Sequence, residues 1–160
     1  MRNTLVQGYF AYGSNMDVAR VRARAMPFLS VTAAQLPGYA LVFDKVAHSH
    51  AGEAHANIEP RFNGVVEGVL YELAEPDAIL VMDRFEQTPI NYSREVVRVV
   101  AADGLRDAWT YFANPARRQT GRAPGRAYLA HLLAGRRFVS EAYLAFLRSH
   151  RCTNDGDADD

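Results

Sequence analysis

Gly13-Ser14-Asn15 interrupt the chain between an expected strand and an expected helix, and they could hold a charged ligand. The apolar run 5–11 predicts the strand, and Asp17 and a helical pattern follow the break. A break of this kind leaves unpaired backbone N–H groups at the N-terminus of a helix, where the helix dipole also favours negative charge. Many strand-to-helix turns share this pattern, but it indicates a site for a carboxylate or a phosphate.

Glu86 is the second candidate for chemistry, because it lies at the end of another expected helix. Pro76 suits the first turn of a helix that would run to about Glu86. At about 100° per residue, Glu86 shares a face with Ile79 and Met82. Beside an apolar stripe a carboxylate loses hydration, which would raise its pKa toward the range useful for proton transfer. The alternative is a helix that ends before Glu86 and leaves the carboxylate to cap a loop or to pair with an arginine.

The string Tyr9-Phe10-Ala11-Tyr12-Gly13-Ser14-Asn15-Met16 resembles the signature loop of the γ-glutamylcyclotransferase family, whose members release 5-oxoproline from γ-glutamyl compounds. The segment 80–86 is similar to the family's second signature, a helix that ends in Asp-x-x-Glu. Asp83 matches the aspartate of that signature and Glu86 its catalytic glutamate. Family members often have glycine after this glutamate, whereas this chain has Gln87 followed by Thr88-Pro89. The resemblance spans roughly residues 9–147.

Three tyrosines extend the resemblance. Tyr92 matches a tyrosine that lies close to the catalytic carboxylate in the family, and Tyr111 matches a tyrosine late in a strand. The segment 123–128 is similar to the family's Pro-Ser-x-x-Tyr, with Gly125 in place of serine, and Tyr128 would help to enclose the substrate. Tyr92 could also be an ordinary residue at a strand start, and Tyr128 could be a core aromatic at the start of a helix.

The resemblance implies an α+β fold, with a small, mixed, partly closed β-sheet or barrel, surrounding helices and a pocket at one end. It implies a cofactor-independent enzyme, of lyase or acyltransferase type, in which the α-amine of the substrate attacks its own γ-carbonyl group. Glu86 would be the general base, with no metal at the site. The substrate-binding residues would be Tyr9, Phe10, Ala11, Tyr12, Gly13, Ser14, Asn15, Tyr92 and Tyr128.

Two alternative functions remain open on the same fold. The leaving amine could be a polyamine, a lysine side chain or a biosynthetic intermediate, as in a γ-glutamylamine cyclotransferase or a biosynthetic enzyme that removes γ-glutamyl groups. The chain could instead be a non-catalytic binding or interaction protein. The presence of Glu86 argues against that function, whereas an arginine-rich last third, from Arg117 to Arg151, favours it as a partner surface.

Other reactive residue types give weaker patterns. His48, His50 and His55 lie near Glu53, but their spacing matches no established zinc ligand pattern. Ser14 lacks the G-x-S-x-G elbow of a serine hydrolase. Cys152 is the only cysteine, so an intrachain disulfide is excluded.

The bulk composition predicts one globular domain over residues 1–152 and a disordered acidic tail over 153–160. Eighteen basic residues balance eighteen acidic residues, so no global field favours nucleic acid or an anionic membrane. The single cysteine and the absence of a signal-peptide pattern favour a cytoplasmic location. The expected partner is a small-molecule γ-glutamyl substrate, bound by a monomer or a homodimer.

The elements that would position these residues follow from hydrophobic pattern and turn signals. Arg20, Arg22 and Arg24 lie off the apolar face of the first helix, which Pro27 stops. Pro37-Gly38 predicts a turn, 45–53 a polar loop, and Asp103-Gly104 a hairpin. The expected strands are 39–44, 54–59 closed by Pro60, 65–73 buried on both faces, 92–101 and 107–113, and the expected last helices are 126–134 and one capped by Ser140.

Overall fold

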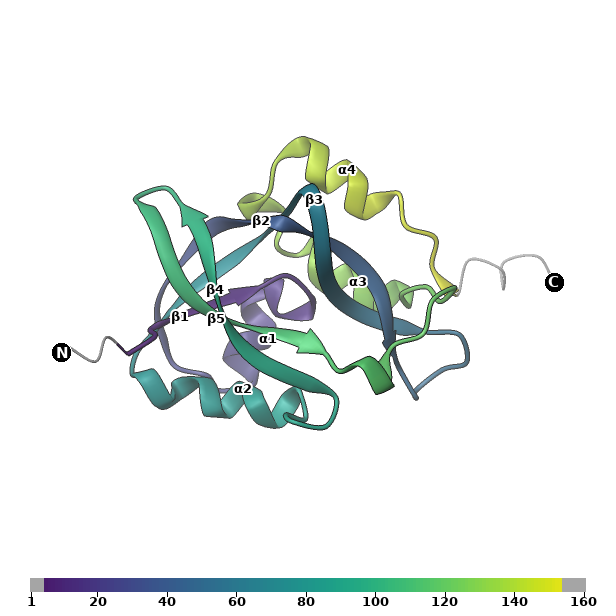
Figure 1. The fold of residues 1–160 in the computed structure, drawn as a ribbon, viewed down its shortest axis with the longest axis horizontal. Coiled ribbons are helices and arrows are strands. Elements are labelled where there is room, and N and C mark those ends of the chain that lie inside the picture. Colours follow the sequence, from purple (N-terminus) through teal and green to yellow (C-terminus); the bar gives the residue numbers. More distant parts are fainter. Residues whose placement is uncertain (1–4, 154–160) are drawn as a thin grey trace.

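The computed structural model describes residues 5–153 of the chain. Its five strands form a closed barrel in the order β1-β3-β2-β4-β5. Neighbouring strands are antiparallel except β1 and β5, which run parallel, so the barrel is mixed. The α+β fold with a small barrel and surrounding helices is therefore confirmed (Figure 1). The strands are β1 (Gly8–Ala11), β2 (Phe28–Val46), β3 (Ala54–Leu73), β4 (Tyr92–Ala101) and β5 (Gly104–Ala113).

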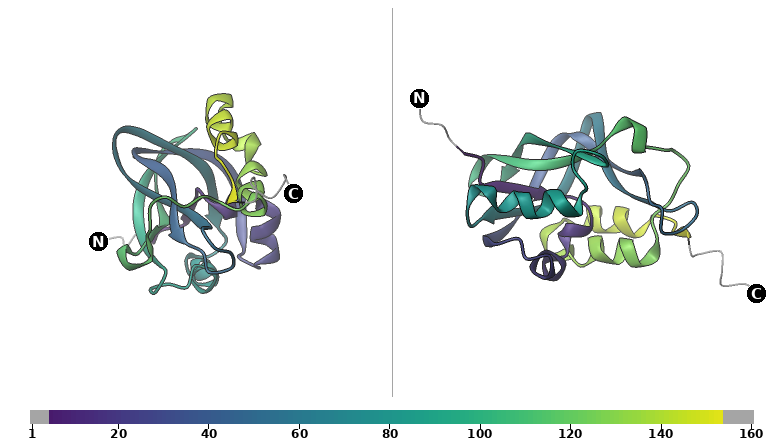
Figure 2. Two further views of the ribbon diagram at one scale, coloured as in Figure 1. Left: turned by 90° about the vertical axis from the view of Figure 1, so that its right-hand side faces the viewer. Right: turned by 90° about the horizontal axis from the view of Figure 1, so that it is seen from below.

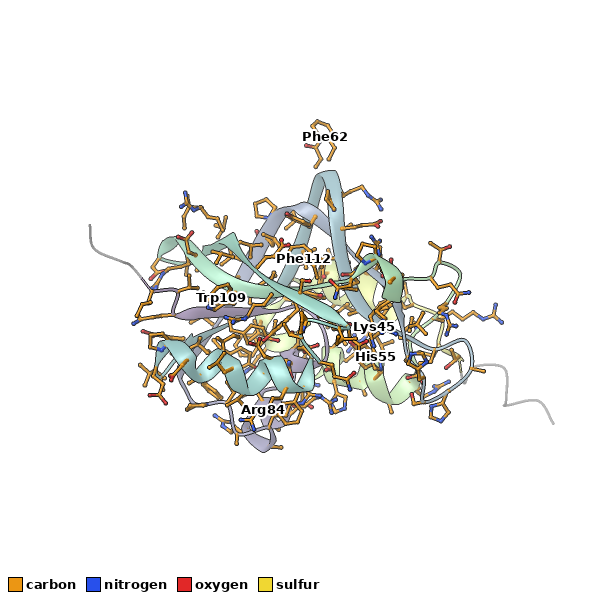
Figure 3. The ribbon with its side chains drawn as sticks, turned by 60° about the horizontal axis from the view of Figure 1, so that its bottom comes forward. Lys45, His55, Phe62, Arg84, Trp109 and Phe112 are labelled. Atoms are coloured by element: carbon orange, nitrogen blue, oxygen red, sulfur yellow. The ribbon has the colours of Figure 1, made fainter. Side chains whose placement is uncertain are left out.

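Strands β2 and β3 form one long antiparallel pair where the sequence predicted several short strands. The predicted turn at Pro37-Gly38 and the predicted strand end at Pro60 are both wrong. Pro37 pairs with Val65 and Tyr39 pairs with Pro60, so residues 61–64 bulge out of β3 opposite Gly38. Gly38 and Asn63 have positive φ angles of 84° and 58°, which a bulge needs as much as a turn does. Figure 3 shows Phe62 projecting from this bulge.

Two strand boundaries bear directly on the site. Strand β1 begins at Gly8 rather than at Leu5, so it is short, and Gly13 lies just after its end. Strand β2 continues to Val46, so Lys45 is a strand residue and the predicted loop 45–53 begins only at Ala47. Lys45 consequently lies in the barrel wall, where its exposed fraction is only 6%.

Within residues 5–153, four short α-helices surround the barrel, namely α1 (Val18–Ala23), α2 (Ile79–Phe85), α3 (Arg126–Leu133) and α4 (Glu141–Arg148). Helix α1 ends well before Pro27, because Ala25 has a φ angle of 63° and leaves the helix. The Ser140 hydroxyl accepts a hydrogen bond from the Tyr143 N–H at 3.1 Å, which confirms the predicted cap of α4. Figure 2 shows α2 away from α3 and α4, which lie side by side. None of the described helices is long and apolar enough to cross a membrane.

The hairpin of β4 and β5 is confirmed, with a two-residue loop at Ala102-Asp103, because Ala101 pairs with Gly104. The prediction that residues 65–73 are buried on both faces holds for Gly68–Tyr71, which are all buried. The predicted disordered tail, apart from Thr153, lies outside the described residues.

Candidate active site

A cavity of about 160 Å³ opens at one end of the barrel, next to the turn that follows β1. All predicted site residues line it except Ala11, which is buried and pairs with Val69 inside the sheet. The prediction that Ala11 contacts substrate is therefore not supported by its position. The lining residues are Tyr9, Phe10, Tyr12, Gly13, Ser14, Asn15, Arg20, Arg24, Lys45, His55, Ala56, Phe85, Glu86, Gln87, Asn91, Tyr92, Thr110, Tyr111 and Tyr128.

Helix α2 presents Glu86 to this cavity. The helix ends at Phe85, one residue earlier than predicted, but the Glu86 N–H still donates to the Met82 carbonyl oxygen at 2.9 Å. Glu86 therefore continues the face of Ile79 and Met82, both of which are buried in the core. Gln87 follows with a φ angle of 51°, a conformation that glycine adopts more easily. This explains in physical terms why glycine suits the position at which the chain departs from the resemblance.

The electrostatic setting of Glu86 suits a proton acceptor. Burial raises the pKa of its carboxyl group to about 7, while the nearby cations Arg24, Lys45 and Arg20 act in the opposite direction. The side chain is only half-buried, because one side of it faces the cavity. A carboxyl group with a pKa near neutral pH can both take and return a proton.

Asn15 connects the signature turn to Glu86. Its Nδ2 group donates to the Tyr9 hydroxyl at 2.9 Å and lies 3.3 Å from Glu86 Oε1. Arg24 donates to Asn15 Oδ1 at 3.0 Å, which fixes the amide so that its NH2 group points toward the carboxylate. The Tyr71 hydroxyl donates to the Asn15 carbonyl oxygen at 2.6 Å and holds the backbone of the turn.

The turn itself is a short 3₁₀ helix, η1 (Ser14–Met16). Its two backbone bonds run from the N–H groups of Met16 and Asp17 to the carbonyl oxygens of Gly13 and Ser14. The N–H groups at the start of the turn are not used by these bonds. A Cβ on Gly13 would lie 3.2 Å from the Tyr128 hydroxyl oxygen, so the absence of a side chain lets the turn approach α3 closely.

Asp83, the other signature carboxylate, has a structural role. It accepts a hydrogen bond from the Tyr111 hydroxyl at 2.7 Å and lies 3.0 Å from Arg94 Nε. The Arg94 guanidinium also lies 4.1 Å from the centre of the Trp109 ring. Asp83 thus anchors Tyr111, whose carbonyl oxygen accepts a hydrogen bond from the Tyr12 hydroxyl at 2.5 Å.

Tyr92 and Tyr128 form a further part of the cavity wall. The Tyr92 hydroxyl donates to the Ala56 carbonyl oxygen at 2.8 Å, and the Ala56 N–H donates to the Tyr128 hydroxyl at 3.0 Å. Both tyrosines are thereby fixed to the same residue of β3. Burial raises the pKa of both phenols well above the ordinary value, so both are neutral at physiological pH.

Three cations in the cavity were not predicted as site residues. Arg20 and Arg24 lie off the apolar face of α1, as expected. The side of the helix that carries them faces the cavity rather than solvent. The sequence predicts a polar loop from residue 45, and only the place of Lys45 in the long strand β2 brings it to the cavity. His131 contacts both Asp17 and Arg20. The sequence alone could not predict these contacts, because His131 lies 114 positions after Asp17.

His50 and His55 lie in different settings. The His50 Nδ1 atom lies 3.0 Å from Glu53 Oε2 in an exposed loop, whereas His55 stacks on Tyr128 with ring centres 4.4 Å apart. Burial, followed by the nearby Lys45 charge, lowers the pKa of His55 to about 4. Within residues 5–153, no group of three or more histidine, cysteine, aspartate or glutamate side chains could hold a metal ion.

The fold matches several solved structures at low sequence identity. The human protein loc79017 has a TM-score of 0.79 and 20% identity, over 92% of this chain and 89% of its own. A gamma-glutamyl cyclotransferase has a TM-score of 0.76 and 18% identity, also over 92% and 89%. A gamma-glutamyl cyclotransferase specific to glutathione from yeast has a TM-score of 0.58 and 15% identity, over 88% and 94%. At these identities, the structures show a shared fold.

Sequence comparison gives the family. Among proteins with curated descriptions, none is similar enough in sequence to match the chain. A family model, described as gamma-glutamyl cyclotransferase, AIG2-like, matches residues 9–130. This stretch runs from the strand before the signature turn to the helix that carries Tyr128. The chain therefore belongs to the gamma-glutamyl cyclotransferase, AIG2-like family.

Proposed function

We propose that the protein is a γ-glutamyl cyclotransferase that releases 5-oxoproline and a free amine from a γ-glutamyl compound. One observation carries the proposal. The Glu86 carboxylate faces a cavity at hydrogen-bond distance from Asn15 of the signature turn, and its pKa of about 7 suits proton transfer. Membership of the family supports the same reaction class.

The proposed reaction is an intramolecular aminolysis with Glu86 as general base. The carboxylate takes one proton from the substrate α-ammonium group, because the protonated nitrogen has no electron pair for attack. The freed amine adds to the γ-carbonyl carbon and closes a five-membered ring. The bond from that carbon to the leaving nitrogen then breaks, and the proton held by Glu86 goes to this nitrogen. The ring nitrogen still carries one proton too many, which Glu86 takes and passes to the departing amine, so that the amine leaves as an ammonium ion and Glu86 ends as a carboxylate. Atoms and charge balance without water, metal or a covalent enzyme intermediate.

The remaining wall would hold the substrate in the curled conformation that ring closure needs, which removes much of the entropic barrier. The backbone N–H groups of residues 12–15 can donate to the substrate's α-carboxylate or to the oxygen that develops charge at the γ-carbon. Tyr92 and Tyr128 are tied to Ala56, so their rings supply a rigid surface rather than a proton source.

The first test is release of 5-oxoproline by the native protein and by Glu86→Gln. The panel comprises γ-glutamyl-alanine, γ-glutamyl-ε-lysine, a γ-glutamyl-polyamine and glutathione. Glutamine keeps the shape of the side chain but cannot accept the proton, so we expect kcat to fall by about 10²–10⁴-fold. For the native protein, kcat/KM should fall as the pH drops below about 7, because Glu86 becomes protonated.

Glu95→Gln is the matched control, since Glu95 is exposed on β4 and outside the cavity. Activity that survives in Glu86→Gln would reject Glu86 as the base while leaving the reaction in place. No release from any member of the panel by the native protein would favour the non-catalytic binding function. Unchanged release after treatment with a chelator is expected, because the proposed mechanism uses no metal.

A further inference from the structure

His131 contacts two residues of helix α1, one with each of its ring nitrogens. Asp17 Oδ2 lies 2.8 Å from His131 Nδ1, and Arg20 Nη1 lies 3.4 Å from His131 Nε2. Asp17 is also the N-cap of α1, since its Oδ1 atom accepts a hydrogen bond from the Ala19 N–H at 3.1 Å. Arg20 follows on the same helix, whereas His131 belongs to α3. These contacts therefore join the two helices next to the signature turn.

The two neighbours of His131 fix the form of its imidazole. A carboxylate only accepts hydrogen bonds and a guanidinium only donates them. His131 therefore donates from Nδ1 to Asp17 and accepts at Nε2 from Arg20, so it is the neutral imidazole with its proton on Nδ1. The carboxylate selects this tautomer by accepting that proton in a hydrogen bond. Asp17 thus prepares His131 as an acceptor for Arg20.

An imidazole between the carboxylate and the guanidinium leaves the charge of Arg20 unneutralised. Within residues 5–153, Arg20 makes no ion pair with a carboxylate, and its buried Nε atom has no hydrogen-bond partner. The contact with His131 holds the guanidinium in place, but a neutral ring does not cancel its charge. The charge of Arg20 therefore acts on the other groups of the cavity.

Arg20 needs such an anchor because a second guanidinium lies near it. The positive charge of Arg20 contributes to lowering the pKa of Arg24, so the two side chains repel one another. Arg24 is held by Asn15 Oδ1 at 3.0 Å and lies over the Phe85 ring. His131 is the matching anchor for Arg20. Without it, repulsion would favour a position of Arg20 farther from Arg24, toward solvent.

The charged groups that act on Glu86 come from three elements. Burial raises the pKa of Glu86, and Asp83 of α2 acts in the same direction, whereas Arg24 and Arg20 of α1 and Lys45 of β2 lower it. The other titratable groups of the lining are neutral at pH 7, because burial lowers the pKa of the histidine and raises that of each tyrosine. They are His55, Tyr9, Tyr12, Tyr92, Tyr111 and Tyr128. Arg20 is thus one of three cations that keep the carboxyl group ionised.

We propose that Asp17 and His131 are positioning residues, which hold the Arg20 guanidinium in the cavity wall so that its charge favours the ionised form of Glu86. The inference rests on the proposed function, because it concerns the base of that reaction. If Arg20 moved away, Glu86 would remain protonated up to a higher pH. The loss of activity should therefore be largest at low pH, and it should vanish where Glu86 is ionised in every variant.

The test is the pH profile of kcat/KM, measured with a γ-glutamyl compound that the native protein turns over. This profile reports the ionisation of the base in the free enzyme. His131→Leu removes the acceptor and should raise the pKa of the acidic limb by about half a pH unit. That shift is about threefold in kcat/KM well below pH 7 and close to none at about pH 8.5. Arg20→Met should give a loss with the same dependence on pH.

Two conservative variants separate positioning from packing. His131→Gln supplies an amide oxygen that can accept from Arg20 and an NH2 group that can donate to Asp17, so it should restore most of the native profile. Asp17→Asn keeps the shape but places a donor against His131 Nδ1, which favours the other tautomer and should shift the profile in the direction of His131→Leu. Arg22→Met is the matched control, because Arg22 is exposed on α1 and outside the cavity lining, and it should keep the native profile.

The double variant Arg20→Met, His131→Leu tests whether His131 acts through Arg20. It should lose no more than Arg20→Met alone, because the group that His131 positions is then already absent. A further pH-dependent loss would overturn the inference. A loss of equal size at every pH in His131→Leu would overturn it as well, since a structural defect does not depend on the ionisation of Glu86.

A native pH profile in Arg20→Met would also reject the inference, even if His131→Leu failed to fold. Each of these results contradicts the inference alone, because the native protein still releases 5-oxoproline. No release from any member of the panel by the native protein would reject the proposed function, and this inference with it.

Discussion

Glu86 must be buried enough to act as a base near neutral pH, and that burial carries a cost in stability. Its pKa rises from the ordinary 4.5 to about 7 in the folded protein. At about 1.36 kcal/mol per pH unit, this difference corresponds to about 3 kcal/mol. The pKa of Glu86 is higher in the folded protein than in the unfolded chain, so protonation of Glu86 favours the folded protein. This contribution to stability is fully present below pH 4.5 and is lost as the pH rises to 7.

Glu86→Gln should therefore become more stable relative to the native protein as the pH rises. The difference in free energy of unfolding between the variant and the native protein should increase by about 3 kcal/mol from pH 4.5 to above pH 7. Denaturant titrations at several pH values would measure it, with Glu95→Gln as an exposed control that should stay flat. A flat profile for Glu86→Gln would mean that burial does not perturb this carboxyl group.

The site residues that the sequence predicts depend on local spacing, whereas those that it does not predict depend on contacts between distant parts of the chain. Glu86 was found because its spacing from Ile79 and Met82 is local and because a signature surrounds it. Arg20 and Arg24 could be placed on the correct face of a helix, but the sequence does not show that this face meets a cavity. Lys45 was missed because its environment depends on strand pairing, in which it pairs with His55.

At the scale of elements, the errors have a common physical cause. Pro37-Gly38 and Pro60, and also Asn63 in the bulge, carry the features of turns, namely a missing N–H or a positive φ angle. In this chain those features serve a bulge, at which two strands bend without ending. Local residues specify the unusual backbone, whereas only the pairing of distant segments decides whether the chain reverses there.

Gly68 illustrates how strand packing positions the signature turn. A Cβ at this position of β3 would lie 2.4 Å from the carbonyl oxygen of Ala11, the last residue of β1, and 2.8 Å from the Phe10 ring. Replacing glycine with alanine usually stabilises by about 0.4–1 kcal/mol through the unfolded state. Overpacking costs about 1–3 kcal/mol, and here the obstacle is backbone that cannot rotate away.

We therefore expect Gly68→Ala to lower the free energy of unfolding by about 2 kcal/mol. It should also lower kcat, because a shift of β1 moves Asn15 relative to Glu86. Denaturant unfolding and 5-oxoproline release would measure the two effects. Val65→Ala is the control on the same strand, since Val65 is 46% exposed and should cost less than about 1 kcal/mol. A Gly68→Ala protein as stable and active as the native one would contradict this account of β1 packing.

At the scale of the whole molecule, the balance of eighteen basic and eighteen acidic residues conceals a local excess of positive charge in the cavity. Three cations and one carboxylate line that space, while the many arginines of the last third are mostly exposed. Surface charges act over a Debye length of about 10 Å at 0.1 M salt, whereas buried charges are screened much less. Recognition of an anionic substrate should therefore come from inside the cavity and depend little on the outer surface.

A weak dependence of activity on ionic strength is therefore expected. With γ-glutamyl-alanine, kcat/KM should fall by less than about threefold between low and moderate salt, because no net charge steers the substrate from a distance. The double variant Arg136→Gln, Arg137→Gln removes two exposed charges outside the cavity and should behave like the native protein. A steep fall of kcat/KM with salt, or its loss in the double variant, would instead show that the exposed arginines attract the substrate. Charge recognition would then lie on the outer surface of the last third rather than on Lys45, Arg20 and Arg24.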